Sequence, residues 1–176
     1  MFAVVTGGSG SGKSAFAEEK VTGLGAGRRI YIATMMCFDE ESKKRVERHR
    51  RMRAGKGFET IECYTGLERL KLPRDGIVLL ECMSNLAANE MFAEEGAGEQ
   101  AVGRILAGLR HIRAQVRHLV VVTNEIFSDG GSYEEETRRY QSCLGEINRS
   151  MAKEADEVTE VVYGIPLYLK RKAGSV

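Results

Sequence analysis

Short apolar runs alternate with longer amphipathic stretches along the chain. Runs of four to seven mostly apolar residues recur between segments whose apolar positions follow a helical period. A parallel sheet buries its strands on both faces and needs a helix in each crossover connection, and such strands read as continuous apolar runs. The alternation therefore predicts an α/β fold with a mostly parallel sheet flanked by helices.

The individual elements follow from the same pattern. The apolar runs predict strands over Phe2–Thr6, Arg29–Thr34, Thr60–Tyr64, Gly76–Cys82, Leu119–Asn124, Val158–Tyr163 and Leu167–Lys170. The helical periods predict helices over Lys13–Thr22, Asn85–Glu95, Gln100–Val116 and Glu134–Glu154. One apolar stripe in the last helix is formed by Tyr140, Cys143, Leu144, Ile147 and Met151. We interpret this stripe as facing the core.

Composition narrows the class of protein. A chain of 176 residues without repeats or linkers fits one domain over residues 1–176. Its 26 Lys and Arg nearly balance 25 Asp and Glu, which excludes a general attraction to nucleic acid or anionic membranes. No apolar run approaches the ~20 residues of a membrane span. The scattered cysteines, Cys37, Cys63, Cys82 and Cys143, favour neither disulfides nor structural zinc, so we expect a cytoplasmic protein.

The strongest motif begins directly after the first predicted strand. It reads, in order, Gly7, Gly8, Ser9, Gly10, Ser11, Gly12, Lys13 and Ser14. This matches the P-loop pattern, in which backbone N–H groups and a helix N-terminus surround a phosphate. Lys13 would contact the terminal phosphates, and the Ser14 hydroxyl would bind Mg²⁺. The alternative is a flexible Gly/Ser loop, but such a loop does not require a lysine followed by a serine between this strand and this helix. We therefore predict a nucleotide-binding site.

A Mg²⁺ site of this kind takes a second acidic group from the end of a neighbouring strand. Glu81 lies near the end of the predicted strand that begins at Gly76 and is our candidate for this metal ligand. The alternative is an ordinary exposed carboxylate at the end of a strand. Glu125 follows another strand at the same edge, where capping is an equal interpretation. The Asn-Lys-x-Asp segment of switch GTPases is missing from the sequence, which disfavours a regulatory G-domain.

A basic segment over Lys43–Lys56 surrounds one histidine, His49. Eight Lys and Arg against one Glu give this segment a local charge of +7. Helical spacing places Arg45 and Arg53 on the same face as His49. Cations favour the neutral, nucleophilic imidazole and bind phosphate oxygens, so His49 could attack a nucleotide α-phosphate and form a phosphoramidate. A solvated basic helix with an incidental histidine is the alternative.

Shorter segments accompany these motifs. They are Tyr31-Ile-Ala-Thr34, Arg45-Val-Glu-Arg-His49-Arg, Thr60-Ile-Glu62, Leu79-Leu-Glu81-Cys, Val122-Thr-Asn-Glu125, and Ala155-Asp-Glu-Val followed by Gly164-Ile-Pro-Leu. With the P-loop, this ordered set resembles the bifunctional adenosylcobinamide kinase / adenosylcobinamide-phosphate guanylyltransferases of cobalamin biosynthesis. The resemblance covers essentially the whole chain.

The resemblance implies a RecA-like P-loop NTPase fold and two reactions. The first phosphorylates adenosylcobinamide with GTP, or ATP as an alternative donor. The second transfers GMP from GTP to adenosylcobinamide phosphate through a guanylyl-histidine, which here would be His49, and releases pyrophosphate. Lys13 would take part in catalysis and Mg²⁺ would be the cofactor. Further nucleotide contacts implied by the resemblance are Thr34, Arg50, Arg51, Arg53, Glu62 and Glu81.

Two positions differ from many members of the family. Gly10 stands where many relatives carry arginine, and residues 126–131 read Ile-Phe-Ser-Asp-Gly-Gly where many have Gly-x-Gly-x-Val-Pro. The exposed basic helix also leads us to expect a homo-oligomer in which a neighbouring subunit completes the site. A small-molecule P-loop kinase without nucleotidyl transfer and a nucleotide-binding regulatory module remain the alternative functions.

Overall fold

Seven strands form one sheet in the computed structural model, which describes residues 1–37, 40–125 and 134–172 except the side chains of Ser42, Arg45 and Met52. The strands are β1 (Phe2–Thr6), β2 (Arg29–Ala33), β3 (Phe58–Glu62), β4 (Ile77–Glu81), β5 (His118–Val122), β6 (Glu157–Val162) and β7 (Ile165–Arg171). Their order across the sheet is β3-β2-β4-β5-β1-β6-β7. All neighbours are parallel except β6 and β7, which form an antiparallel pair at one end of the sheet.

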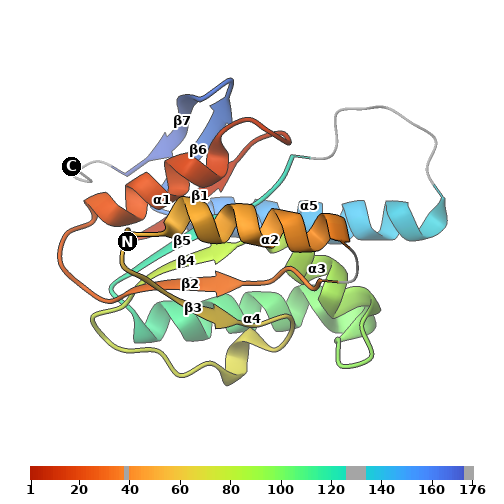
Figure 1. Ribbon diagram of the computed structural model, residues 1–176. Coiled ribbons are helices and arrows are strands. Elements are labelled where there is room, and N and C mark those ends of the chain that lie inside the picture. Colours follow the sequence, from red (N-terminus) through yellow and green to blue (C-terminus); the bar gives the residue numbers. More distant parts are fainter. Residues whose placement is uncertain (38–39, 126–133, 173–176) are drawn as a thin grey trace.

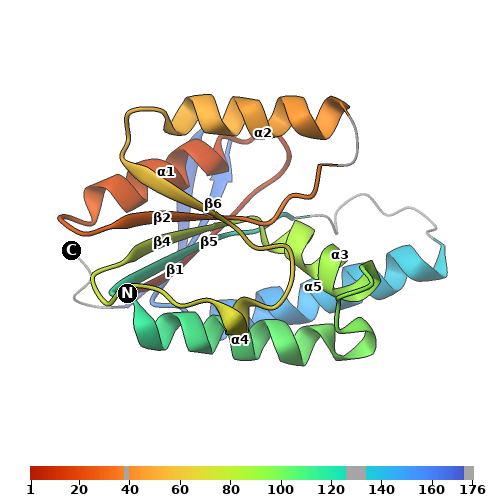
Figure 2. The ribbon, with the colours of Figure 1, turned by 60° about the horizontal axis from the view of Figure 1, so that its bottom comes forward.

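Helices cover both faces of the sheet (Figures 1 and 2). One face carries α1 (Lys13–Gly23) and α2 (Glu40–Arg53). The opposite face carries α3 (Met83–Phe92), α4 (Ala101–Gln115) and α5 (Glu135–Glu154). Two 3₁₀ turns, Leu67–Arg69 and Gly98–Gln100, connect these elements. No helix in the described ranges is both long and apolar enough to cross a bilayer.

The core lies in two layers because the strands are apolar on both faces. Along β1, Phe2 and Val4 pack into the layer under α3, α4 and α5, whereas Ala3 and Val5 pack into the layer under α1. Such two-sided burial is typical of parallel strands with crossover helices. The central strands therefore hold the site-bearing loops in fixed positions at their carboxyl ends.

The structure confirms the predicted α/β class, with shifts at element ends. The third strand begins at Phe58 rather than Thr60, and the last strand runs from Ile165 rather than Leu167. The predicted stripe on α5 is core, since Cys143, Leu144, Ile147 and Met151 are buried there. These differences arise because strand ends depend on pairing with a neighbour, which apolar runs alone do not fix.

The parallel register brings several chain segments to one edge. Ala33, Glu81 and Val122 are aligned across β2, β4 and β5, and Val122 pairs with Val5 of β1. The loop after β1 therefore leaves the sheet beside the ends of β4 and β5. Ligands in open α/β sheets bind at this carboxyl edge.

Candidate active site

A cleft of about 610 Å³ opens at the carboxyl edge of the sheet. Its walls come from the P-loop, from the ends of β2 and β4, and from α2, which lies across the sheet beside α1 (Figure 1). Ser9 to Ser14 line it, whereas Gly7 and Gly8 are not among its lining residues. Most of the residues that the sequence predicts to bind a nucleotide therefore line this cleft.

The P-loop has the backbone that its glycines permit. Gly10 and Gly12 have φ of 72° and 92°, a region that side chains rarely adopt. A Cβ on Gly7 would lie 2.5 Å from the carbonyl oxygen of Val161. The loop is thus packed against β6 at its base and open to the cleft at its tip.

Lys13 turns back onto this loop. Its Nζ donates a hydrogen bond to the carbonyl oxygen of Gly8 at 3.0 Å. Burial lowers the pKa of Lys13, while electrostatic interactions with Cys82 and Glu81 act in the opposite direction. The ammonium group therefore sits in a partly desolvated cleft, where an anion would stabilise its charge.

Ser14 and Glu81 form the second part of the site. The Ser14 hydroxyl donates a hydrogen bond to Glu81 Oε1, and the Tyr31 hydroxyl donates to Glu81 Oε2 at 3.2 Å. Glu81 is 8% exposed. A hydroxyl and a carboxylate are both oxygen ligands of the kind that Mg²⁺ prefers, so the donor set fits this ion. The two candidate metal ligands predicted from the sequence lie together.

His49 reaches the same cleft from α2. Its Nδ1 lies 3.7 Å from Glu81 Oε1, and this nitrogen is buried without a hydrogen-bond partner. The sequence predicts arginines around this ring, and Arg53 on the same helix face does line the cleft, but the structure also places the Glu81 carboxylate beside Nδ1. The order of the strands brings this carboxylate here, since it places the end of β4 beneath α2.

The basic helix has one cleft-facing side. Val46, His49 and Arg53 are spaced by three and four residues, and all three line the cleft. Arg53 is 7% exposed, and its Cζ lies 3.4 Å from the centroid of the Tyr31 ring. This cation–π contact and the burial of the Arg53 side chain pack α2 against the sheet, which the highly charged composition of the helix did not indicate.

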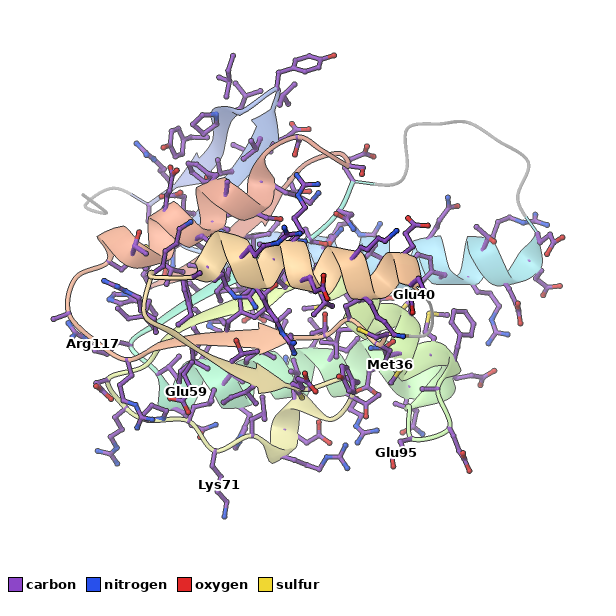
Figure 3. All side chains as sticks on the ribbon, in the orientation of Figure 1. Met36, Glu40, Glu59, Lys71, Glu95 and Arg117 are labelled. Atoms are coloured by element: carbon purple, nitrogen blue, oxygen red, sulfur yellow. The ribbon has the colours of Figure 1, made fainter. Side chains whose placement is uncertain are left out.

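The other arginines are more exposed. Arg50 lines the cleft and pairs with Glu62 at 3.4 Å, whereas Arg51 is exposed and is not a lining residue. The Arg45 side chain lies outside the described residues. Charged side chains also project from the outer surface of α2, where Glu40 marks its start (Figure 3). The predicted arginine cluster is therefore divided between the cleft and the solvent.

Thr34 is buried rather than placed on the cleft wall. Its side chain is 0% exposed and donates a hydrogen bond to the carbonyl oxygen of Cys82 at 2.8 Å. Its backbone N–H donates to the carbonyl oxygen of Glu81. Thr34 thus joins the end of β2 to the end of β4. Its hydrogen bonds go to the backbone of Glu81 and Cys82, which line the cleft.

Two acids predicted near the site do line the cleft. Glu62 is about half exposed, accepts a hydrogen bond from the Tyr64 hydroxyl at 2.9 Å and pairs with Arg50. Glu125 lines the cleft beside the P-loop, where its N–H donates to the carbonyl oxygen of Gly7. The segment after it, residues 126–133, lies outside the described residues.

Sequence reasoning missed Glu18. This residue is fully buried on α1, and its Oε2 accepts a hydrogen bond from Lys56 Nζ at 2.7 Å. Glu18 follows Ser14 by four residues, so both side chains lie on one face of α1. This spacing is the feature of the sequence that could have identified Glu18. A carboxylate on that face points toward the ends of the strands and not toward solvent.

Relatives of the chain match nearly its whole length. The bifunctional adenosylcobalamin biosynthesis protein CobU of Salmonella typhimurium is 32% identical over 97% of this chain and 100% of the relative. CobU of Escherichia coli is 31% identical over 97% and 100%. CobP of Pseudomonas aeruginosa, also named as a bifunctional adenosylcobalamin biosynthesis protein, is 26% identical over 95% and 96%.

Solved structures support the fold. The flagellar accessory protein FlaH from Methanocaldococcus jannaschii matches with a TM-score of 0.53 at 13% identity, covering 97% of this chain and 78% of that chain. An ATPase from the type III secretion system of pathogenic bacteria matches with a TM-score of 0.54 at 10% identity, covering 90% and 50%. These similarities to P-loop ATPases confirm the predicted P-loop NTPase fold. Because residues 3–169 match the family described as cobinamide kinase / cobinamide phosphate guanyltransferase, the chain belongs to this family.

Proposed function

We propose that this chain phosphorylates adenosylcobinamide and then transfers GMP from GTP to adenosylcobinamide phosphate, with both reactions carried out in the one cleft by one catalytic domain. The observation that carries the proposal is the meeting of His49 with Lys13, Ser14 and Glu81 in that cleft. The P-loop provides phosphate binding, and His49 provides a nucleophile.

The guanylyl transfer follows as two displacements. An imidazole nitrogen of His49 attacks the α-phosphorus of GTP, the N–P bond forms, and the bond to the β-phosphate oxygen breaks with release of pyrophosphate. A phosphate oxygen of adenosylcobinamide phosphate then attacks the same phosphorus, and the N–P bond breaks. The products are adenosylcobinamide-GDP and free His49.

The remaining residues stabilise charge and position phosphates. The ammonium group of Lys13 and the N–H groups of the P-loop offset negative charge on the triphosphate during both reactions. Ser14 and Glu81 would hold Mg²⁺, which when bound neutralises phosphate oxygens. Arg50 and Arg53 line the wall next to His49 and are the arginines we assign to nucleotide contacts, with Glu62 on the rim.

Radiolabelled GTP tests this proposal. After incubation with Mg²⁺, label in the α-phosphate should remain on the protein and be acid-labile. His49→Asn should remove this label. The control is His111→Asn, which should retain the label, because the native His111 ring contacts the carbonyl oxygen of Leu70 and does not line the cleft. Label that persists in His49→Asn would reject the histidine. Transfer of the γ-phosphate alone would favour a plain kinase, and turnover without any corrinoid would favour a regulatory module.

We also propose that the protein is a homo-oligomer. The β6–β7 end of the sheet carries exposed apolar side chains: Tyr163 is 94% exposed, and Ile165 and Leu169 are each 62% exposed. Apolar groups gathered on one hairpin are typical of an interface. Light scattering coupled to size-exclusion chromatography should give a mass above 19.5 kDa for the chain, and Ile165→Lys with Leu169→Lys should lower it.

A further inference from the structure

Three metal-ligating side chains meet on the inner side of α2. Glu18 of α1, His49 of α2 and Glu81 of β4 each offer one donor atom, and these atoms all lie within 4.8 Å of one another. The residues are far apart in sequence and come from three elements. Their meeting is therefore a property of the fold.

Two of the donors are buried without a partner. Glu18 is 0% exposed, and its Oε1 accepts no hydrogen bond, although its Oε2 is paired with Lys56. His49 Nδ1 is also buried and unpartnered. Leaving such groups unsatisfied costs roughly 1–3 kcal/mol each. Both atoms belong to the same cluster, so one bound ion would satisfy both.

The chemistry of the donors indicates the kind of ion. Two ligand atoms on a tetrahedral Zn²⁺ with bonds of about 2.0–2.1 Å lie roughly 3.3 Å apart. His49 Nδ1 and Glu81 Oε1 are 3.7 Å apart, and all three donor atoms lie within 4.8 Å of one another, so the side chains must move closer to reach this spacing. One imidazole nitrogen with two carboxylate oxygens favours Zn²⁺ or Co²⁺ over Mg²⁺ or Ca²⁺, which prefer oxygen alone.

We propose that Glu18, His49 and Glu81 form a binding site for one divalent transition-metal cation of the Zn²⁺ class. Lys56 pairs with Glu18 and Lys13 interacts electrostatically with Glu81, so a bound cation would share the two carboxylates with these ammonium groups. A bound ion would tie α2 to α1 and to the end of β4, with Nδ1 of His49 as its nitrogen ligand. The site is argued from these three side chains in the nucleotide-free protein and does not depend on the proposed guanylyl transfer. Because that reaction uses His49 as nucleophile and Glu81 as a Mg²⁺ ligand, this cation and the nucleotide with Mg²⁺ would occupy the cleft in turn.

Cobalt absorption tests the site directly. The full chain, carrying Cys37→Ser because Cys37 is an exposed thiol, is stripped of metal with a chelator and titrated with Co²⁺ without nucleotide. We expect one equivalent to bind with visible d–d bands, without a thiolate charge-transfer band, and one equivalent of Zn²⁺ to displace it. Failure of the protein to bind either ion would overturn the proposal.

Matched variants assign the ligands. Glu18→Gln and His49→Ala should each weaken Co²⁺ binding by about tenfold or more, since loss of even an outer-sphere partner costs 10–100-fold. Glu19→Gln, an exposed carboxylate on the next position of α1, should bind Co²⁺ as the parent does. Circular dichroism verifies folding, and if Glu18→Gln is unfolded, His49→Ala decides. Parent-like affinity in His49→Ala, or in a folded Glu18→Gln, contradicts the site.

Discussion

The Ser14 hydroxyl donates a hydrogen bond to the carboxylate of Glu81, although 67 residues separate them in sequence. Strand β5 lies between β1 and β4 in the sheet, so the P-loop must extend over β5 to make this contact. The bond joins the start of α1 to the end of β4. It brings together the two oxygen donors that we assign to Mg²⁺.

Replacing Glu81 should weaken the use of Mg²⁺. In Glu81→Gln the neutral amide is a poorer ligand for a hard cation, and we expect the Mg²⁺ concentration for half-maximal protein labelling by GTP to rise about tenfold or more. Initial labelling rates over a Mg²⁺ titration provide the measurement. Glu59→Gln, on β3 (Figure 3), is the control and should behave as the parent does. An unchanged Mg²⁺ dependence in Glu81→Gln would count against the assignment.

Replacing Lys13 should abolish nucleotide binding without lowering the stability of the fold. Lys13→Met removes the cation that contacts phosphates, so we expect binding of a fluorescent GTP analogue and both transfers to be lost. Because burial lowers the pKa of Lys13, its charged form is disfavoured in the nucleotide-free cleft, and Tm should stay equal or rise.

The control is Lys71→Met. Lys71 lies in an exposed loop (Figure 3), so its replacement should leave both binding of the GTP analogue and Tm unchanged. A large fall in Tm for Lys13→Met would mean that the lysine has a structural role. Retained binding of the GTP analogue would show that the triphosphate does not use this lysine.

Two neighbouring glycines should respond differently to alanine. At Gly7 a Cβ would lie 2.5 Å from the Val161 carbonyl oxygen and 2.6 Å from Ser11 Oγ, whereas at Gly8 it would meet nothing within 4 Å. We expect Gly7→Ala to lower the free energy of unfolding by about 1–3 kcal/mol and Gly8→Ala by much less. Urea unfolding of both variants measures the difference. Equal losses would contradict the close approach of the P-loop to β6.

Asp156 should make stability depend on pH in acid. A hydrogen bond from Lys172 at 2.6 Å and another from the Phe2 backbone N–H at 2.7 Å hold the pKa of Asp156 below its ordinary value of 3.8. The contribution is therefore present above that value and is lost as pH falls through the lower folded-state pKa.

In Asp156→Asn the acid-dependent part of this contribution should be absent. We expect its stability at pH 7 to be lower by on the order of 1 kcal/mol, with the gap between variant and parent closing toward pH 2–3. Urea midpoints across this range test the sign. A gap that widens in acid would contradict the assigned contacts.

The sequence predicted the parts of the site that depend on local pattern. The P-loop, its flanking strand and helix, and the acid at the end of β4 follow from spacing along short segments, and the structure brings these parts together. Thr34 was less predictable, because its depth depends on how the end of β2 pairs with β4. The docking of α2 was not predictable either, since it includes the contact of Arg53 with the ring of Tyr31, a residue on another element.

The Lys13–Gly8 hydrogen bond has a consequence for ligand choice. Without nucleotide, the ammonium group is already held by an acceptor within its own loop, so an arriving anion exchanges one partner for another. The gain from this lysine is then the difference between a charged phosphate oxygen and a neutral peptide oxygen, which is smaller than the gain of an unpaired ammonium group. A ligand with several phosphates, which engages the loop N–H groups and the cation together, would offset this loss most fully.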